Sequence, residues 1–228
     1  MKNQSNMKPI LFSTPMVQAI LDGRKTQTRR IMKPQPFKNG SFWEWAGAAW
    51  SNDGPITPAY GHSMYNKCPF KPEDVLYVRE TFAACENPFG DYLYKADYQT
   101  ASKTDLEIKK WSPSIHMPKD AARVFLRITD VKAERLQDIS EADAIAEGVE
   151  SFRPVPGDGD PVTMYRLYDK KNPEKPFMLY NAKSSFISLW KSINGPESWN
   201  QNPWVWAYTF ERCERPQSEI VNPKSAIL

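Results

Sequence analysis

Residues 203–210 place the strongest constraint on the fold, because every second residue in this segment is aromatic. In a β-strand, residues two apart point to the same face, so Trp204, Trp206, Tyr208 and Phe210 share one side of a predicted strand. Aromatic side chains bury large areas, and a stripe of this kind more often forms core than an exposed platform for bases. The sequence therefore predicts a β-sheet with an aromatic core on one face.

Three short helices are expected between the strands. Thr14 suits the N-cap of the first helix, and Gly23 suits its C-terminal stop. Ser140 and Gly148 bracket a second helix with acidic residues in its first turn, where the helix dipole favours them. Residues 184–193 carry the apolar pattern of a third helix.

Two further strands are predicted at residues 75–78 and 124–129, and two long blocks rich in Gly and Pro interrupt the pattern at about 34–70 and 151–183. Strands separated by unequal loops and short helices favour an α+β domain built round a small mixed sheet or barrel. A chain of 228 residues fits one domain decorated by these two blocks.

Composition excludes several function classes. The net charge of +3 is too small to indicate nucleic acid by itself, so any such signal must be local. Three cysteines without CxxC spacing and two distant histidines predict neither a metal site nor a disulfide framework. No dinucleotide, P-loop or GxSxG motif is present, so no cofactor is expected. No long apolar run or signal peptide is visible, which predicts a cytoplasmic protein without membrane contact.

The local signal is the segment at residues 23–30. It contains two threonines, no carboxylate and four cations, which are Arg24, Lys25, Arg29 and Arg30. Because the segment follows a predicted helix stop, we expect these side chains to hold fixed positions and to face an anion. The competing interpretation is a solvated basic strand.

Lys25 and Thr28 form a candidate catalytic pair. Threonine becomes a nucleophile when a base removes its proton, and a neutral lysine amine can act as that base when neighbouring cations or burial lower its pKa. Arginines or backbone N–H groups can then stabilise the oxyanion that develops on an attacked amide. In a regular strand residues three apart point to opposite faces, so the two side chains can meet only across a turn or bulge.

Four blocks of the chain carry a family resemblance. A helix ending in Ile-Leu-Asp-Gly precedes Arg-Lys-Thr-x-Thr-Arg; a Pro-x-Asp-x-Leu-x-Val-Arg-Glu strand follows, and a later strand leads into Ile-Ser-Glu-x-Asp-Ala-x-Ala-Glu-Gly. In this order the blocks resemble the ASCH domain of the PUA-like superfamily, of the type common in bacteriophages and prophages. The matching blocks are residues 8–33, 71–82, 123–150 and 184–212.

The resemblance implies a small PUA-like β-barrel with flanking short helices, the two insertions and a tail at residues 213–228. It also implies a cleft for RNA, a modified nucleoside or single-stranded nucleic acid. One branch of the family hydrolyses N4-acetylcytidine with a lysine, a threonine and a glutamate, and these positions correspond to Lys25, Thr28 and Glu147. By helical period alone, Glu147 lies nearly opposite Ile145 and would be a solvent-facing charge.

Other residues and functions complete the set of expectations. Trp43 and Trp45 lie in the first insertion, where they either stack on bases or pin the loop to the domain. Arg79 and Glu80, which end a predicted strand, are either substrate-binding residues or a surface ion pair. The amidohydrolase competes with two alternatives, a non-catalytic reader of RNA or modified bases and a ribonuclease. The oligomeric state is left open.

Overall fold

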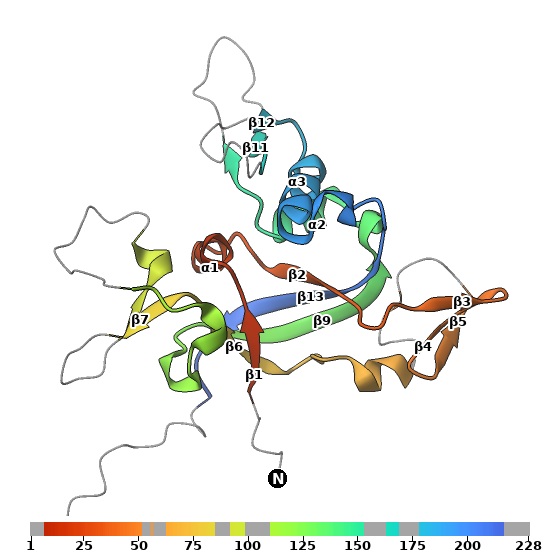
Figure 1. Cartoon of the computed structure of the whole chain (residues 1–228), viewed down its shortest axis with the longest axis horizontal. Coiled ribbons are helices and arrows are strands. Elements are labelled where there is room, and N and C mark those ends of the chain that lie inside the picture. The colour runs from red at the N-terminus through yellow and green to blue at the C-terminus, as the bar shows by residue number, and fades with distance from the viewer. Residues whose placement is uncertain are drawn as a thin grey trace, which may run out of the picture. The chain divides into compact units, whose positions relative to one another are not determined.

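The computed structural model describes residues 7–51, 56, 63–84, 92–98, 110–152, 163–168 and 178–216 (Figure 1). The chain divides into two compact units, each assembled from separate segments. Unit 1 comprises Met1–Gln18, Pro72–Ile128 and Phe210–Leu228, and unit 2 comprises Ala19–Lys71 and Thr129–Thr209. The single-domain organisation stays a prediction.

Unit 1 is built on a mixed sheet. β1 (Lys8–Leu11) pairs in parallel with β6 (Val75–Arg79), and β6 pairs antiparallel with the first residues of β9 (Phe125–Arg135). A second, two-stranded ladder joins β7 (Phe82–Ala84) to β8 (Tyr92–Tyr94). Short 3-10 helices lie at Lys95–Asp97, Ser114–His116 and Lys119–Ala121. The core of this unit contains Met7, Phe82, Met117, Ala121, Ala122 and Phe125.

Unit 2 contains the rest of β9, most of β13 (Trp204–Cys213) and β2 (Gln27–Ile31). β2 runs antiparallel to β13 and ends the hydrogen-bonded strand order β1-β6-β9-β13-β2. Within the described residues no pairing links β1 to β2, so these strands form an open sheet where a barrel was expected. The predicted α+β class is confirmed.

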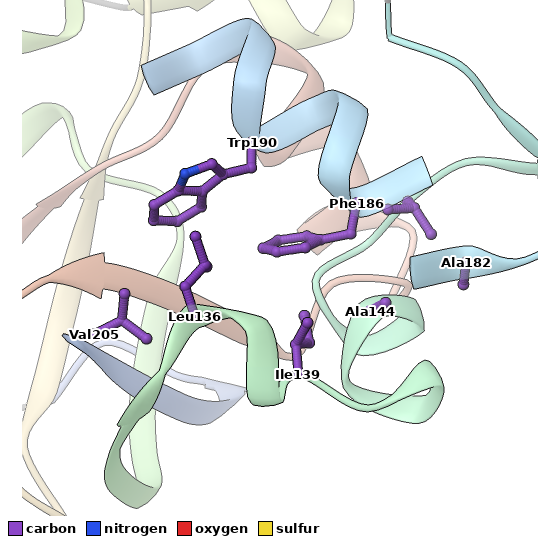
Figure 2. Close-up of a cluster of buried hydrophobic side chains, with 8 residues drawn as sticks. Leu136, Ile139, Ala144, Ala182, Phe186, Trp190 and Val205 are labelled. Atoms are coloured by element: carbon purple, nitrogen blue, oxygen red, sulfur yellow. The ribbon is translucent and has the colours of Figure 1, made fainter. Parts of the chain in front are cut away.

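Two helices, α2 (Glu141–Ala146) and α3 (Ala182–Asn194), lie side by side in unit 2 (Figure 1). Figure 2 shows Phe186 and Trp190 of α3 directed towards Leu136 and Ile139. The buried members of this cluster are Leu136, Ile139, Ala144, Val149, Ala182, Phe186, Trp190 and Val205. Apolar side chains of both helices and Val205 of β13 therefore belong to one core cluster, which joins the helices to the sheet.

The aromatic stripe of β13 is buried, as the sequence predicts: Trp204, Trp206, Tyr208 and Phe210 are at most 3% exposed. The first insertion covers part of this stripe. It is not irregular throughout, because it contains the antiparallel strands β3 (Phe37–Asn39), β4 (Phe42–Trp45) and β5 (Ala48–Trp50) and a 3-10 helix at Ser63–Lys67. Inward-facing indoles of β4 and β5 pack edge-on against the indoles of β13.

The second insertion is also partly regular. Its described residues form the small antiparallel sheet β10 (Ser151–Phe152), β11 (Met164–Arg166) and β12 (Met178–Leu179). The sequence gives little sign of either added sheet, because each strand has only two to four residues and no sustained alternation. The remaining 3-10 helices lie at Leu136–Asp138 and Pro196–Ser198.

The predicted helix boundaries hold to within about two residues, the usual uncertainty of such ends. α1 spans Thr14–Leu21, and the amide of Val17 donates to the carbonyl of Ser13 at 3.0 Å, so Ser13 and not Thr14 precedes the helix. Gly23 adopts a φ of 75° after the last turn, as expected of a stop. Ser140 caps α2 in a capping box with Asp143.

Candidate active site

The basic segment begins between the C-terminal ends of α1 and α2. The amide of Lys25 donates to the carbonyl of Ala19 at 2.9 Å, and the amide of Thr26 donates to the carbonyl of Ala146 at 2.8 Å. Lys25 also forms an isolated antiparallel bridge with Glu147. Backbone contacts with both helix ends therefore fix the segment before β2 begins.

Lys25 is a buried cation with a full set of acceptors. Its side chain is 1% exposed, and Nζ lies 2.8 Å from Oε2 of Glu147. The same nitrogen donates to the carbonyl oxygens of Glu147 at 2.9 Å and Gln27 at 2.7 Å. A lysine ammonium has three donors, and these three contacts can engage all of them.

Gly148 makes room for this lysine. Its φ is 85°, and a Cβ at this position would lie 2.7 Å from the Cβ of Lys25 and 3.2 Å from its Cα. Any side chain would therefore combine a left-handed backbone with a steric clash. The glycine that the sequence assigns to a helix stop also allows the helix end to approach Lys25.

Glu147 joins two cations from the basic segment. Its Oε2 accepts from Lys25, and its Oε1 accepts from Nη1 of Arg29 at 3.2 Å. The expectation of a solvent-facing glutamate is wrong, because the side chain is buried at 5% exposure while Ile145 is 46% exposed. The helical period itself holds, because Glu147 keeps helical backbone angles and the two residues lie on opposite sides; the error is the assumption that Ile145 faces the core.

Arg29 is held by a carboxylate that sequence analysis did not single out. Its Nε donates to Oε1 of Glu134 at 2.9 Å, and Nη2 lies 2.8 Å from the same oxygen. Glu134 is 1% exposed, and its Oε2 lies 3.1 Å from Nζ of Lys132. The guanidinium also lies 6.0 Å from the centre of the Phe186 ring. No neighbouring residue in the sequence indicates this pairing, because Arg29 lies 105 positions before Glu134.

Thr28 and Arg30 lie on the other face of β2 from Arg29. In register, Thr28 is opposite Tyr208 and Arg30 is opposite Trp206, and directly opposed residues share a face. Thr28 is 3% exposed. Burial lowers the pKa of Arg30, whereas the charge of Glu147 and the phenol of Tyr208 act to raise it.

The convergence of Lys25 and Thr28 stays a prediction, and two observations bear on it. Lys25 precedes β2, so the alternation of that strand does not fix its direction. Its Nζ reaches the carbonyl of Gln27, the residue next to Thr28. Because β2 is the edge strand of the order given above, a side chain at its start can approach either face.

Burial lowers the pKa of Lys25, and nearby arginines add to this effect. Burial is the largest cause, because an ammonium loses its hydration in the interior. The charge of Glu147 and its hydrogen bond oppose the shift, while Arg30 and Arg29 reinforce it. Buried groups whose charge is disfavoured in this way are typical of functional sites.

Of the remaining predicted ligand-binding residues in unit 2, Arg24 reaches the surface, whereas Trp45 is buried. Arg24 is partly exposed and donates to the carbonyl of Gly148 at 3.1 Å, which puts a cation at the solvent side of the lysine. Trp45 is 6% exposed, packs 5.5 Å from Trp206 between ring centres, and donates to the carbonyl of Pro34. This placement fits an anchor for the insertion and not a stacking platform.

Trp43 is half-buried and also faces inward. Its ring lies edge-on to Trp204 at 5.6 Å, and the guanidinium of Arg135 lies 5.4 Å from its centre. The outward face of the same hairpin instead carries Phe37 and Phe42, which are more than half exposed. The insertion therefore uses its tryptophans to pack on β13.

Arg79 and Glu80 belong to unit 1, whereas residues 24–30 belong to unit 2. They do not form the surface ion pair that was one of the two expectations. Glu80 is 1% exposed and bonds to Arg123 through both carboxylate oxygens. The guanidinium of Arg79 donates to the carbonyls of Ile115 and Met117. Both side chains hold the segment that leads into β9.

Metal, thiol and membrane-spanning features add no further candidate among the described residues. Within the described ranges, no three His, Cys, Asp or Glu residues gather as a metal ion would require. The described cysteines, Cys68 and Cys213, are in no disulfide, while His62 and Cys85 lie outside the described residues. Of the helices that the structure describes, none has the length and apolar character of a membrane span.

The arrangement brings together three of the ten predicted site residues, Lys25, Arg29 and Glu147, in direct contact, whereas Thr28 and Arg30 lie on the opposite face of β2 from Arg29. Such a site can hold a proton between a lysine and a carboxylate in a dry environment. Compared with known proteins, the chain matches no family model, no curated protein and no solved structure.

Proposed function

We propose that the protein hydrolyses the amide of an N4-acylated cytidine or a related modified nucleobase, on an ASCH-like fold of the PUA-like superfamily. Lys25, Thr28 and Glu147 carry the reaction in this proposal. The substrate class comes from the sequence resemblance, and the assignment of roles comes from the chemistry of the residues.

One observation carries the proposal. The 2.8 Å contact between Nζ of Lys25 and Oε2 of Glu147 joins two residues 122 positions apart, and both side chains are almost fully buried. Sequence motifs alone had selected these two residues as catalytic partners. A buried pair of this kind costs desolvation energy that an apolar pair would avoid, which favours a functional reason for it.

The proposed reaction begins with proton transfer. Lys25 passes a proton to Glu147 across their contact, which gives a neutral amine and a carboxylic acid. The amine then takes the proton of the Thr28 hydroxyl as its oxygen attacks the acyl carbon. Glu147 returns a proton to the departing N4 nitrogen, so the cytidine leaves neutral and the acyl group stays on Thr28 until water releases it.

Arginines next to the lysine supply the electrostatic part. Arg30 shares the Thr28 face of β2, where its guanidinium can stabilise the oxyanion that forms during attack. Burial and the positive charges of Arg29 and Arg30 favour the neutral amine that the reaction needs. Arg24 is partly exposed and pairs with Asp22 at 3.0 Å, so a negatively charged part of a substrate would compete with that carboxylate for it.

A non-catalytic reader has less support. That alternative needs exposed aromatic side chains beside a basic groove, and the two tryptophans chosen for this role pack inward on β13. A solvated basic strand is also a poor fit, since Lys25 and Arg29 are at most 1% exposed in their side chains.

The test is turnover of N4-acetylcytidine and other N4-acylated cytidines, followed as cytidine release by chromatography. Parent protein is compared with Lys25→Met, Thr28→Val and Glu147→Gln. Asp97→Asn is the control, because it also converts an ion-paired carboxylate to an amide but lies in unit 1.

Release by the parent and by Asp97→Asn, with a loss of at least about a hundredfold in the other three variants, is the expected result for a base, a nucleophile and a proton donor. Circular dichroism confirms that each variant is folded. If the folded parent releases cytidine from none of the substrates, the hydrolase proposal is wrong.

A further inference from the structure

Glu134 is a buried acid that the proposed reaction does not use. Its carboxylate is 1% exposed and lies on β9, 105 positions beyond Arg29 in the sequence. One oxygen accepts from Arg29, and the other lies 3.1 Å from Lys132. A buried carboxylate between two cations is well compensated, so its burial alone does not require a function.

The geometry of Arg29 links Glu134 to the candidate active site. The guanidinium has a rigid planar fork, so contacts on one edge orient the other edge. Nε and Nη2 meet Glu134, and Nη1 meets Oε1 of Glu147 at 3.2 Å. The second oxygen of Glu147 then meets Lys25. Four charged side chains are thus connected in the order Glu134, Arg29, Glu147 and Lys25.

We propose that Glu134 is a positioning residue that holds Arg29 against Glu147 and thereby fixes the contact between Glu147 and Lys25. This inference deepens the proposed function and rests on it for its catalytic meaning. Glu134 touches no reacting atom in the proposal, and its effect passes through Arg29.

The charged groups around this chain of contacts come from each element packed on it. Lys25 is faced by Glu147 at the end of α2 and by Arg29 and Arg30 of β2, while α1 contributes the carbonyl of Ala19 to its backbone. Arg29 and Lys132 also approach Asp143 of α2, at 3.5 Å and 3.6 Å. The negative charge of Glu134 therefore sits between two cations, one buried and one partly exposed.

Two variants should move Lys25 in opposite directions. In Glu134→Gln, Arg29 loses its main counter-charge and pairs more strongly with Glu147, which then stabilises the charge of Lys25 less. The midpoint of Lys25 titration should therefore fall by about half a pH unit or more. In Lys132→Gln, Glu134 loses its second cation and the positive charge near the site decreases, so the midpoint should rise. Lys132 is 23% exposed in its side chain, so its removal threatens the fold less.

The midpoint is measured by NMR on the full chain labelled in lysine, using the Nζ resonance that disappears in Lys25→Met. The pH dependence of cytidine release gives a second readout, because the rate should follow the neutral amine. A merely structural role would reduce stability and rate in both variants without moving the midpoint.

Opposite shifts in the two variants support the proposal, and if Glu134→Gln does not fold, the rise in Lys132→Gln decides. An unmoved midpoint in folded Lys132→Gln, or a shift of the same sign in both variants, overturns it. Shifts without turnover in the parent would leave the positioning role standing and reject the hydrolase. Turnover with an unmoved midpoint would support the hydrolase and reject the positioning role of Glu134.

Discussion

Two ion-pair networks, one in each unit, use similar side chains but differ in burial. The Lys25 network consists of Lys25, Arg29, Glu134 and Glu147 in unit 2. The Arg123 network consists of Arg123, Glu80 and Asp97 in unit 1. In the second network Arg123 bonds to both oxygens of Glu80, at 2.9 Å and 3.1 Å, and to both oxygens of Asp97, at 2.7 Å and 3.0 Å.

The two central cations differ in the balance between burial and pairing. Burial disfavours the charge of Arg123, but hydrogen bonds to Glu80 and Asp97 outweigh it and raise the pKa of the guanidinium. For Lys25, burial outweighs the attraction of Glu147 and lowers the pKa of the amine. Arg123 is also 27% exposed in its side chain, against 1% for Lys25.

In the proposed function, this difference separates a structural ion pair from a reactive one. Arg123 presents a planar fork to two carboxylates, which is the geometry that makes an ion pair strong. Lys25 is a point charge with one carboxylate and two carbonyls, placed beside two arginines. The surroundings of Lys25 leave its proton easier to remove, which suits a base and is a poor way to build a stable contact.

The largest expected effect comes from removing each cation. Arg123→Met leaves Glu80 buried without its bidentate partner, and the free energy of unfolding should fall by about 3–5 kcal/mol. Lys25→Met should cost only about 1–2 kcal/mol, because Glu147 keeps Arg29 and the burial cost of the ammonium disappears. Urea unfolding at neutral pH measures both losses.

The comparison fails if Lys25→Met proves the more costly change. The double variant Lys25→Met/Glu147→Gln sharpens it, since removing both charges should recover part of the loss of the single variant. If the double variant loses as much stability as the two single variants lose together, the two charges do not interact strongly.

Local signals in the sequence predict most of the regular elements. The aromatic stripe of β13, the capping box at Ser140 and the stop at Gly23 all depend on neighbouring residues only, and the structure has each of them. The small sheets of the two insertions were not predicted, because two- to four-residue strands carry too little periodicity. Their existence depends on packing against β13 and α3.

A second prediction concerns the glycine that the Lys25 network requires. Gly148→Ala places a Cβ 2.7 Å from that of Lys25 at a φ of 85°. Backbone strain and overpacking together should cost about 2–4 kcal/mol. Gly40→Ala is the matched control, since its φ is 59° but nothing lies within 4 Å of the added methyl.

The control should lose about 1 kcal/mol, from backbone strain alone. Equal losses in the two variants would show that the helix end yields to the methyl group, and that Gly148 does not hold Lys25 in place. Chemical denaturation gives both values, and the difference between them isolates the contact with the lysine.

The site was predicted less completely than the fold, for a physical reason. Lys25 and Glu147 were selected by motif. Helical period alone put Glu147 in solvent, because it assumed that Ile145 faces the core, whereas Ile145 is 46% exposed and Glu147 is buried. Glu134 was missed since nothing next to it in sequence shows that Arg29 lies opposite. Contacts between residues more than a hundred positions apart leave no local pattern in one sequence.

The smallest expected effect is a slope of stability against pH. The folded-state pKa of Lys25 is lowered from 10.5, so between the folded value and 10.5 the unfolded chain binds more protons than the folded one. Stability should therefore rise with pH across that window, by up to about 1.4 kcal/mol per pH unit for this one group. Below the folded value the slope from Lys25 vanishes.

The measurement is the difference in unfolding free energy between the parent and Lys25→Met, from about pH 7 to about pH 10.5, the range in which lysine titrates. Subtracting the variant removes the contribution of every other group that titrates alike in both proteins. The same difference for Arg123→Met should be flat, because the raised pKa of Arg123 keeps it protonated in both states throughout. If the difference in unfolding free energy between the parent and Lys25→Met does not change with pH, Lys25 is a structural cation like Arg123. The electrostatic basis for a catalytic lysine is then removed.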